Sequence, residues 1–133
     1  FFSSFGGNPV SCEVGKAVLH VINEEGLQEN ARLVGNYFKE RLKKLQSKFP
    51  VIGDVRGSGL FLGIEFIKGE DLTPNTELAQ LIKNEFRDQH ILISTDGPYD
   101  SVIKSKPPLC FTKDNVDQVI DMLSSILTRE MRK

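Results

Sequence analysis

The sequence predicts a two-layer α+β domain, in which a small, mostly antiparallel sheet carries helices on one face. Two observations support this fold class. Apolar residues recur every three or four positions along four segments, as in amphipathic helices. Between these segments lie two regions, residues 51–67 and 91–106, whose apolar runs are short, rich in β-branched residues and broken by glycine or proline. Strands joined by such short turns should pair antiparallel.

The first two predicted helices follow each other directly. Asn8 is a favourable N-cap, and Pro9 suits a first helical turn. Apolar residues then recur at helical spacing until Gly26. The second helix begins at Leu27, has the clearest division into an apolar and a charged face, and is terminated by Pro50.

The rest of the chain alternates between strands and helices. We expect a third helix capped by Thr73 or Asn75, and a last helix capped by Thr112. A sheet this small needs a cover on its second face, which we expect another domain or subunit to provide. The expected strands, with turns at 57–59 and 96–98, are residues 51–56, 60–67, 91–94 and 101–106.

The composition is that of one globular domain. Its 133 residues are 39% hydrophobic, and 17 basic residues face 18 acidic ones. This balance gives no field that would draw the chain to nucleic acid or to an anionic membrane, and no apolar run approaches the roughly 20 residues of a membrane span. Cys12 and Cys110 form neither a metal-binding spacing nor a disulfide framework. We therefore expect a reducing compartment, with the cytoplasm as the location.

Two segments are candidate anion sites. Ser4, Gly6 and Gly7 lie just before a helix N-terminus, whose free N–H groups and partial positive charge suit a phosphate; an ordinary capped loop explains the same residues. Lys104 and Lys106 are two apart in a strand, so both ammonium groups would project from one face and could hold a phosphate or carboxylate. Lysines that protect an edge strand are the alternative.

Other motifs are weak or missing. The glycines of residues 57–63 resemble a dinucleotide-binding motif only superficially, because a strand pattern rather than a helix follows them. The sequence offers no metal-ligand cluster and no nucleophile with a matching base. The residues alone therefore predict candidate anion sites without a complete reaction centre.

Three segments together resemble the C-terminal region of class-III aminotransferases, which are pyridoxal 5′-phosphate enzymes of fold type I. Residues 5–12 resemble that family's T-F-G-G-N-P-x-x-C/A segment, residues 54–63 its V-R-G-x-G-L-x-x-G strand–turn–strand, and residues 104–109 its R-x-x-P-P-L strand end. The segments occur in the family's order. Residues 96–98, followed by 104–112, are most similar to the alanine–glyoxylate aminotransferase 2-like branch, which includes ethanolamine-phosphate phospho-lyases.

The resemblance implies a domain division and two site residues. Residues 1–24 would be an interface segment and linking helix, and residues 25–133 the small C-terminal domain of a homodimeric enzyme. Ser4 stands where the family usually has threonine, whose hydroxyl reaches the cofactor phosphate of the neighbouring subunit. Lys104 stands where many family transaminases have an arginine that binds the substrate. A lysine is a point charge rather than a bidentate fork, which favours a phosphate over a carboxylate.

The resemblance also implies a function for the whole enzyme: a transaminase, or a phospho-lyase acting on a phosphorylated amine, with a small amine or amino acid as substrate. Family members carry the lysine that forms the Schiff base with the cofactor on a large domain, which is absent from this sequence. We therefore expect this chain alone to be inactive, to hold no catalytic residue, and to expose apolar surface on its first helix and on the sheet. The alternative is a non-catalytic protein-interaction domain derived from the same fold.

Overall fold

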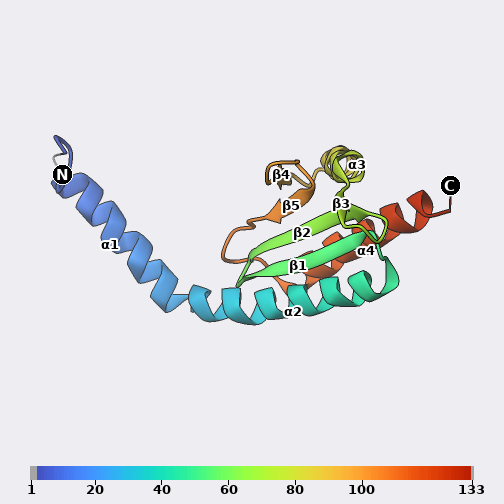
Figure 1. Ribbon diagram of the computed structural model, residues 1–133. Helices are drawn as coiled ribbons and strands as arrows, with labels where there is room; N and C mark the ends of the chain where they lie inside the picture. Colours follow the sequence, from blue (N-terminus) through green and yellow to red (C-terminus); the bar gives the residue numbers. More distant parts are fainter. Residues whose placement is uncertain (1–2, 133) are drawn as a thin grey trace.

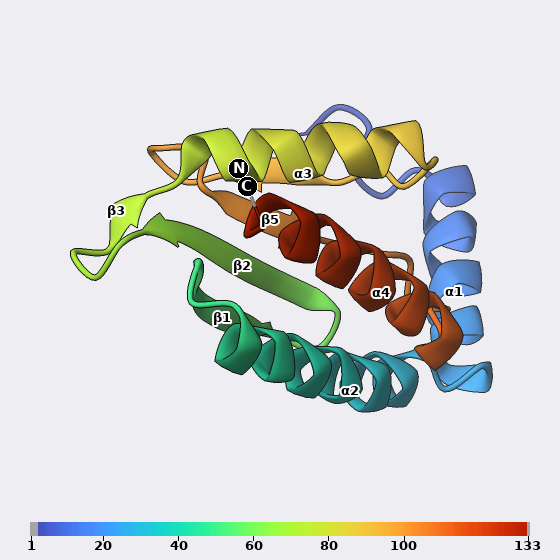
Figure 2. The ribbon, with the colours of Figure 1, turned by 90° about the vertical axis from the view of Figure 1, so that its right-hand side faces the viewer.

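The computed structural model describes residues 3–132 and confirms the predicted α+β architecture. Its elements are α1 (Pro9–Glu24), α2 (Leu27–Lys48), β1 (Ile52–Ser58), β2 (Phe61–Lys68), β3 (Thr73–Pro74), α3 (Thr76–Asp88), β4 (Ser94–Asp96), β5 (Val102–Ser105) and α4 (Lys113–Glu130). The sheet has the order β1-β2-β5-β4 with all pairs antiparallel, and β3 pairs with the end of β2. Helices α2, α3 and α4 cover one face of it (Figures 1 and 2).

The hydrophobic core lies between the sheet and these three helices. Because side chains alternate along a strand, the aligned residues Val55, Ile64 and Ile103 of β1, β2 and β5 all face the helices and are buried. The burial of such apolar side chains is the main source of stability for a domain of this size. The helices contribute Val34, Phe38, Leu42, Ile82, Phe86, Val116, Ile120, Leu123 and Leu127 to this core.

Helix α2 approaches the turn between β1 and β2 so closely that only glycine fits at the contact. A Cβ atom on Gly35 would lie 2.1 Å from the carbonyl oxygen of Gly59. Gly59 itself has a φ of +53°, in the left-handed region that glycine adopts without a steric penalty. Lys39 of α2 adds a polar link, since its Nζ donates to the carbonyl oxygen of Gly57 at 3.1 Å. The position of the hairpin is therefore fixed by α2.

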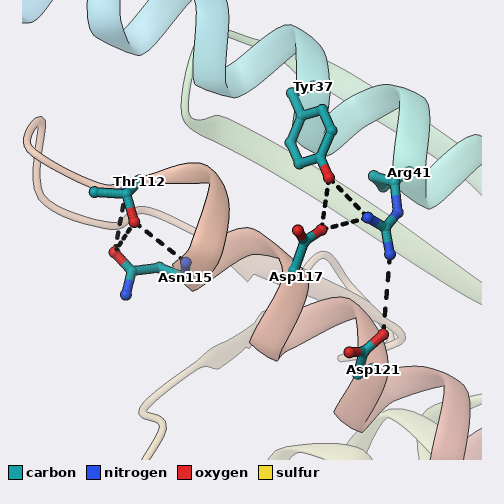
Figure 3. A network of polar contacts seen from close by, with 6 residues as sticks. All are labelled: Tyr37, Arg41, Thr112, Asn115, Asp117 and Asp121. Atoms are coloured by element: carbon teal, nitrogen blue, oxygen red, sulfur yellow. Dashed lines mark hydrogen bonds and ion pairs between the residues drawn. The ribbon is translucent and has the colours of Figure 1, made fainter.

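A polar network joins α2 to α4 (Figure 3). The hydroxyl of Tyr37 donates to Oδ1 of Asp117 at 2.7 Å, and this hydrogen bond is the main reason why the pKa of Tyr37 is raised. Arg41 donates through Nη1 to the Tyr37 hydroxyl at 2.7 Å and to the same Asp117 carboxylate. Its Nη2 lies 3.9 Å from Asp121, one turn further along α4. The network fixes the relative position of the two helices beside the core.

Side chains cap the N-termini of three helices, as the sequence predicts. Asn8 caps α1, and Thr112 caps α4 through a capping box with Asn115 (Figure 3). Of the two candidates for α3, the structure selects Asn75, whose side chain accepts the N–H of Leu78. The remaining candidate lies in β3, a two-residue strand that the sequence did not indicate.

The predicted strand over residues 91–94 is wrong. After α3 the chain turns at His90, which has a φ of +64°, and the N–H of Ile91 donates to the carbonyl oxygen of Phe86 at 2.9 Å. The segment therefore ends the helix instead of pairing with another strand. Its isoleucines, Ile91 and Ile93, pack against the core. Strand β4 begins only at Ser94. The other strands differ from the predicted ones by one or two residues at their ends.

Helix α1 differs from the other helices because none of its side chains is buried. Its apolar residues are largely exposed, with exposed fractions of 74% for Val10, 59% for Val14 and 53% for Val18. Among the described elements α1 contacts α2 alone, which it meets at Gly26. Figure 1 shows α1 extending away from the rest of the domain. The expectation that the first helix exposes apolar surface is thus confirmed.

Candidate functional site

The face of the sheet that the helices leave open carries charged side chains in two cross-strand rows. Arg56, Gly63 and Lys104 lie opposite one another on β1, β2 and β5. In the next row, Asp54 lies opposite Glu65. Since residues two apart on a strand share a face, both rows lie on the side away from the core. Lys104, predicted to bind the substrate, therefore lies on the open face.

An ion pair fixes the side chain of Lys104. Its Nζ donates to Oδ2 of Asp96 at 2.5 Å, and Oδ1 of the same carboxylate accepts the backbone N–H of Gly97 at 2.8 Å. The hydrogen bond from Lys104, then that from Gly97, and the charges of Lys104 and Lys106 lower the pKa of Asp96. The Lys104 side chain is 27% exposed, so its position is fixed while part of it is accessible to a ligand.

A pocket of about 430 Å³ surrounds Lys104 on this face. Arg56, Asp96 and Lys104 are its charged lining residues, and the apolar side chains of Phe61 and Val102 line it on either side of the row that contains Lys104. The volume lies in the range of small-molecule sites, and a few polar groups in an apolar surround are typical of them. The arrangement can therefore accept a small organic ion.

Lys106 contacts an aromatic ring that lines the same pocket. It follows the last residue of β5, and its Nζ lies 4.7 Å from the centre of the Phe61 ring, a cation–π contact. Phe61 lines the pocket around Lys104. The spacing did not indicate that Lys104 would pair with a carboxylate and Lys106 with a ring. That the two ammonium groups hold one anion stays a prediction.

The loop that follows the two lysines is tied to the start of α2. The side-chain amide of Asn30 donates to the carbonyl oxygens of Leu109 at 2.7 Å and of Phe111 at 3.0 Å. These contacts join residues about 80 positions apart, so no local sequence signal could have indicated them. They hold the loop between β5 and α4 against the helical layer.

The second predicted site residue, Ser4, lies in an exposed turn before α1. Oδ1 of Asn8 accepts the N–H of Ser11 at 3.0 Å, while its amide donates to the carbonyl oxygen of Phe5 at 2.9 Å, so the cap also fixes the turn. Gly7 has a φ of +76°, and no atom lies within 4 Å of where its Cβ would be. The turn is thus ordered by its own contacts and is not covered by any other part of residues 3–132.

The structure does not bring the two predicted site residues together. Ser4 lies at the end of α1 that is farthest from the sheet, whereas Lys104 lies on the sheet (Figure 1). Their roles towards a cofactor and a substrate stay predictions. Sequence reasoning missed Arg56 and Asp96 as neighbours of Lys104, because only the strand register reveals that they share its face.

Residues 3–132 contain neither a metal-binding cluster nor a helix able to span a membrane. In that range no group of three or more histidine, cysteine, aspartate or glutamate side chains is arranged to hold a metal ion. None of the helices in the described part of the chain combines the length and the apolar character that crossing a bilayer requires.

Proteins of one known family share this fold. The model of the class-III aminotransferases matches residues 2–127, so the chain belongs to this family, whose members depend on pyridoxal 5′-phosphate. It is 43% identical, over its full length, to 27% of a Drosophila melanogaster protein named alanine–glyoxylate aminotransferase 2-like. Over 99% of the chain it is 37% identical to human alanine–glyoxylate aminotransferase 2, mitochondrial, of which it covers 26%. The chain thus spans about a quarter of the length of these curated relatives.

Solved structures agree with this assignment. A phospholyase from Arthrobacter in complex with phosphoethanolamine superimposes with a TM-score of 0.90 at 36% identity, over 96% of this chain and 31% of that one. An amine transaminase from an uncultivated Pseudomonas species, in the pyridoxal-phosphate-bound form, gives a TM-score of 0.84 at 27% identity, over 97% and 29% of the two chains. The resemblance stated from the sequence motifs is therefore confirmed at the level of family and fold.

Proposed function

We propose that this chain forms the small domain of a homodimeric class-III enzyme, with residues 1–24 as interface segment and linking helix and residues 25–133 as the domain itself. The observation that carries the proposal is helix α1, which is amphipathic yet buries none of its side chains within the chain. Apolar patches of this kind mark surfaces that another part of a protein covers. A large domain accounts for that cover, since the chain matches only 27% of its Drosophila relative.

Ser4 would bind the phosphate of pyridoxal 5′-phosphate held by the neighbouring subunit. The exposed Ser4 turn supports this role, because its hydroxyl and the adjacent N-terminus of α1 offer donors and a partial positive charge. The open surroundings of Gly7 leave the backbone accessible to a phosphate. When bound, the cofactor supplies the electron sink for reactions at the carbon next to the substrate amine.

Lys104 would bind the anionic group of a small amine or amino-acid substrate. Its ammonium lies in a pocket of suitable size, and Asp96 fixes its position. A lysine cannot form the bidentate pair that an arginine makes with a carboxylate, which favours a phosphorylated amine. The similar Arthrobacter phospholyase was solved with phosphoethanolamine. We therefore place phospho-lyase activity first and transaminase activity second.

The proposed location is the cytoplasm. Cys12 and Cys110 are both free and exposed, as in a reducing compartment. Because the human relative is named as mitochondrial, fractionation of cells that make the full-length protein is the direct check, and recovery with mitochondria would contradict this location.

The experiment uses the full-length protein and, beside it, the 133-residue chain. We expect the full-length protein to release inorganic phosphate from phosphoethanolamine, and borohydride to fix pyridoxal 5′-phosphate to one lysine outside this sequence. The chain alone should show neither activity nor a stoichiometric adduct. A defined adduct within this sequence would contradict the proposal. Absence of both activities and of any adduct in the full-length protein would favour the protein-interaction alternative.

The same preparation tests Ser4 against its neighbour. In the full-length protein, Ser4→Ala should weaken cofactor binding about tenfold, the effect of losing one hydrogen bond to a charged group, as measured by absorbance titration of the apoprotein. Ser3→Ala is the matched control, since it removes an equally exposed hydroxyl one position away. Equal effects of the two variants would contradict the role of Ser4.

A further inference from the structure

The open face of the sheet carries a second cation that the proposed function leaves without a role. Arg56 lies in the same cross-strand row as Lys104, with Gly63 between them on β2. The geometry points to a two-cation pocket, in which Arg56 and Lys104 together bind the oxyanion of the substrate, either a phosphate monoester or a carboxylate. This inference rests on the proposed function, because it extends the role of Lys104 to a partner on another strand.

Gly63 leaves room between the two cations. Neighbouring strands lie about 4.8 Å apart, so the backbones that carry Arg56 and Lys104 are two such spacings apart, with no side chain between them. A Cβ on Gly63 would lie 3.3 Å from Cγ1 of Val102 and 3.8 Å from Cγ of Arg56. A longer side chain would therefore fill the middle of the pocket. Its absence lets an anion reach both cations at once.

Both cations keep hydrogen-bond donors for a ligand. Arg56 pairs with Asp54 at 2.9 Å and with Glu65 at 2.5 Å, and both contacts use Nη1. Among residues 3–132, Nη2 and Nε of Arg56 have no hydrogen-bond partner, and Lys104 donates to Asp96 alone. A guanidinium fork and an ammonium group on opposite sides suit the several oxygens of an oxyanion.

Three carboxylates lie close to the two cations. They offset the positive charge on this face, so the pocket has no excess positive charge that would attract every anion. Binding then depends on direct hydrogen bonds from cations that are already in place. The hydrogen bonds to Asp54 and then to Glu65 raise the pKa of Arg56, whose guanidinium carries its charge in any case. The carboxylates concerned are Asp54, Glu65 and Asp96.

The apolar side chains of the pocket suit the rest of such a ligand. Phe61 is 55% exposed, and it lies on one side of the row formed by Arg56, Gly63 and Lys104, while Val102 lies on the other side. The short carbon chain of an amine substrate can lie against these side chains while its anionic group contacts the cations. The pocket therefore fits an organic oxyanion better than a free inorganic ion.

A purely structural role for Arg56 is the competing explanation, because its ion pair with Glu65 joins β1 to β2. The two explanations predict different behaviour of two variants. Arg56→Gln removes the cation together with its ion pairs to Asp54 and Glu65, whereas Glu65→Gln removes the cross-strand ion pair but keeps the cation. If the ion pair is all that matters, both variants should have the same effect.

The test uses the full-length holoenzyme with each variant. We expect Arg56→Gln to raise the KM for phosphoethanolamine about 10- to 100-fold, as for losing a charged hydrogen bond, while kcat changes less than threefold. Arg56→Lys should restore part of the affinity, and Glu65→Gln should leave KM within about threefold although it also loses the cross-strand ion pair. Equal KM values for the Gln variants, or a fall in kcat alone, would overturn the inference.

Inorganic phosphate and acetate serve as probes that do not require turnover. Calorimetric titration of the holoenzyme should show that one of them binds and that Arg56→Gln weakens it about tenfold or more. Binding of phosphate identifies a phosphate monoester as the ligand class, and binding of acetate identifies a carboxylate. If the enzyme proves inactive on every amine, this titration still decides the role of Arg56, and the proposed function fails separately. Binding of neither probe, or binding unchanged by the variant, would overturn the inference.

Discussion

Helices α1 and α2 follow each other in the chain and are both amphipathic, but only α2 packs its apolar face within the described structure. Helix α2 buries Phe38 and Leu42, which are 1% and 0% exposed. In α1 no side chain is buried, and Val18 is 53% exposed. An apolar stripe thus predicts that a helix has a partner, but it does not indicate whether the partner belongs to the same chain. The proposed large domain or partner subunit would account for the difference, and most of each curated relative does lie outside the matched segment.

The largest difference should appear when a core side chain of each helix is truncated. Leu42→Ala should lower the free energy of unfolding of the 133-residue chain by about 2–5 kcal/mol, because it leaves a cavity in a packed core. Val18→Ala should change it by less than about 0.5 kcal/mol, as for an exposed site. Urea unfolding followed by circular dichroism measures both.

The full-length protein sharpens this first comparison. There Val18→Ala should destabilise by more than it does in the 133-residue chain, since the proposed large domain or partner subunit would cover α1. An equal loss for both substitutions in the short chain would mean that α1 packs against the domain in solution, and the contrast between the helices would be lost.

A second pair of variants uses the glycines in the middle of the two helices. Gly35→Ala should destabilise by about 1–3 kcal/mol or more, because its Cβ would lie 2.1 Å from the carbonyl oxygen of Gly59 and the hairpin would have to move. Gly15→Ala meets no atom within 4 Å, and it should stabilise α1 by about 0.5–1 kcal/mol through helix propensity. Thermal unfolding measures the effect of Gly35→Ala, and amide exchange within α1 measures that of Gly15→Ala, because α1 has no buried residue that couples it to the core. A stabilising Gly35→Ala would show that α2 does not approach the turn as described.

The same contrast explains which parts of the fold the sequence could predict. The helices, their caps at Asn8 and Thr112 and the antiparallel pairing depend on local patterns, and the structure has them where they were expected. The segment at residues 91–93 was misassigned because a short apolar run has the same composition whether or not its backbone pairs.

The candidate site shows the limit of local patterns more clearly. Lys104 was found from a motif, yet its neighbours Arg56 and Asp96 are 48 and 8 positions away in the sequence and meet it only through the strand register. The contacts of Asn30 with the loop after β5 are equally remote. Such contacts depend on which strands are neighbours, and a single sequence does not specify that order.

The smallest expected difference concerns the N-caps of α1 and α4. Thr112→Ala should lower the free energy of unfolding by about 1 kcal/mol, because α4 contributes Val116 and Leu127 to the core and its first turn unfolds with the domain. Asn8→Ala removes a comparable hydrogen bond, but α1 has no buried residue, so its first turn can fray without loss of the core. The global free energy should then change by less than about 0.5 kcal/mol, while amide exchange in the first turn of α1 becomes faster. Urea unfolding and hydrogen exchange of the 133-residue chain distinguish the two effects, and a loss for Asn8→Ala as large as that for Thr112→Ala would mean that α1 unfolds cooperatively with the domain.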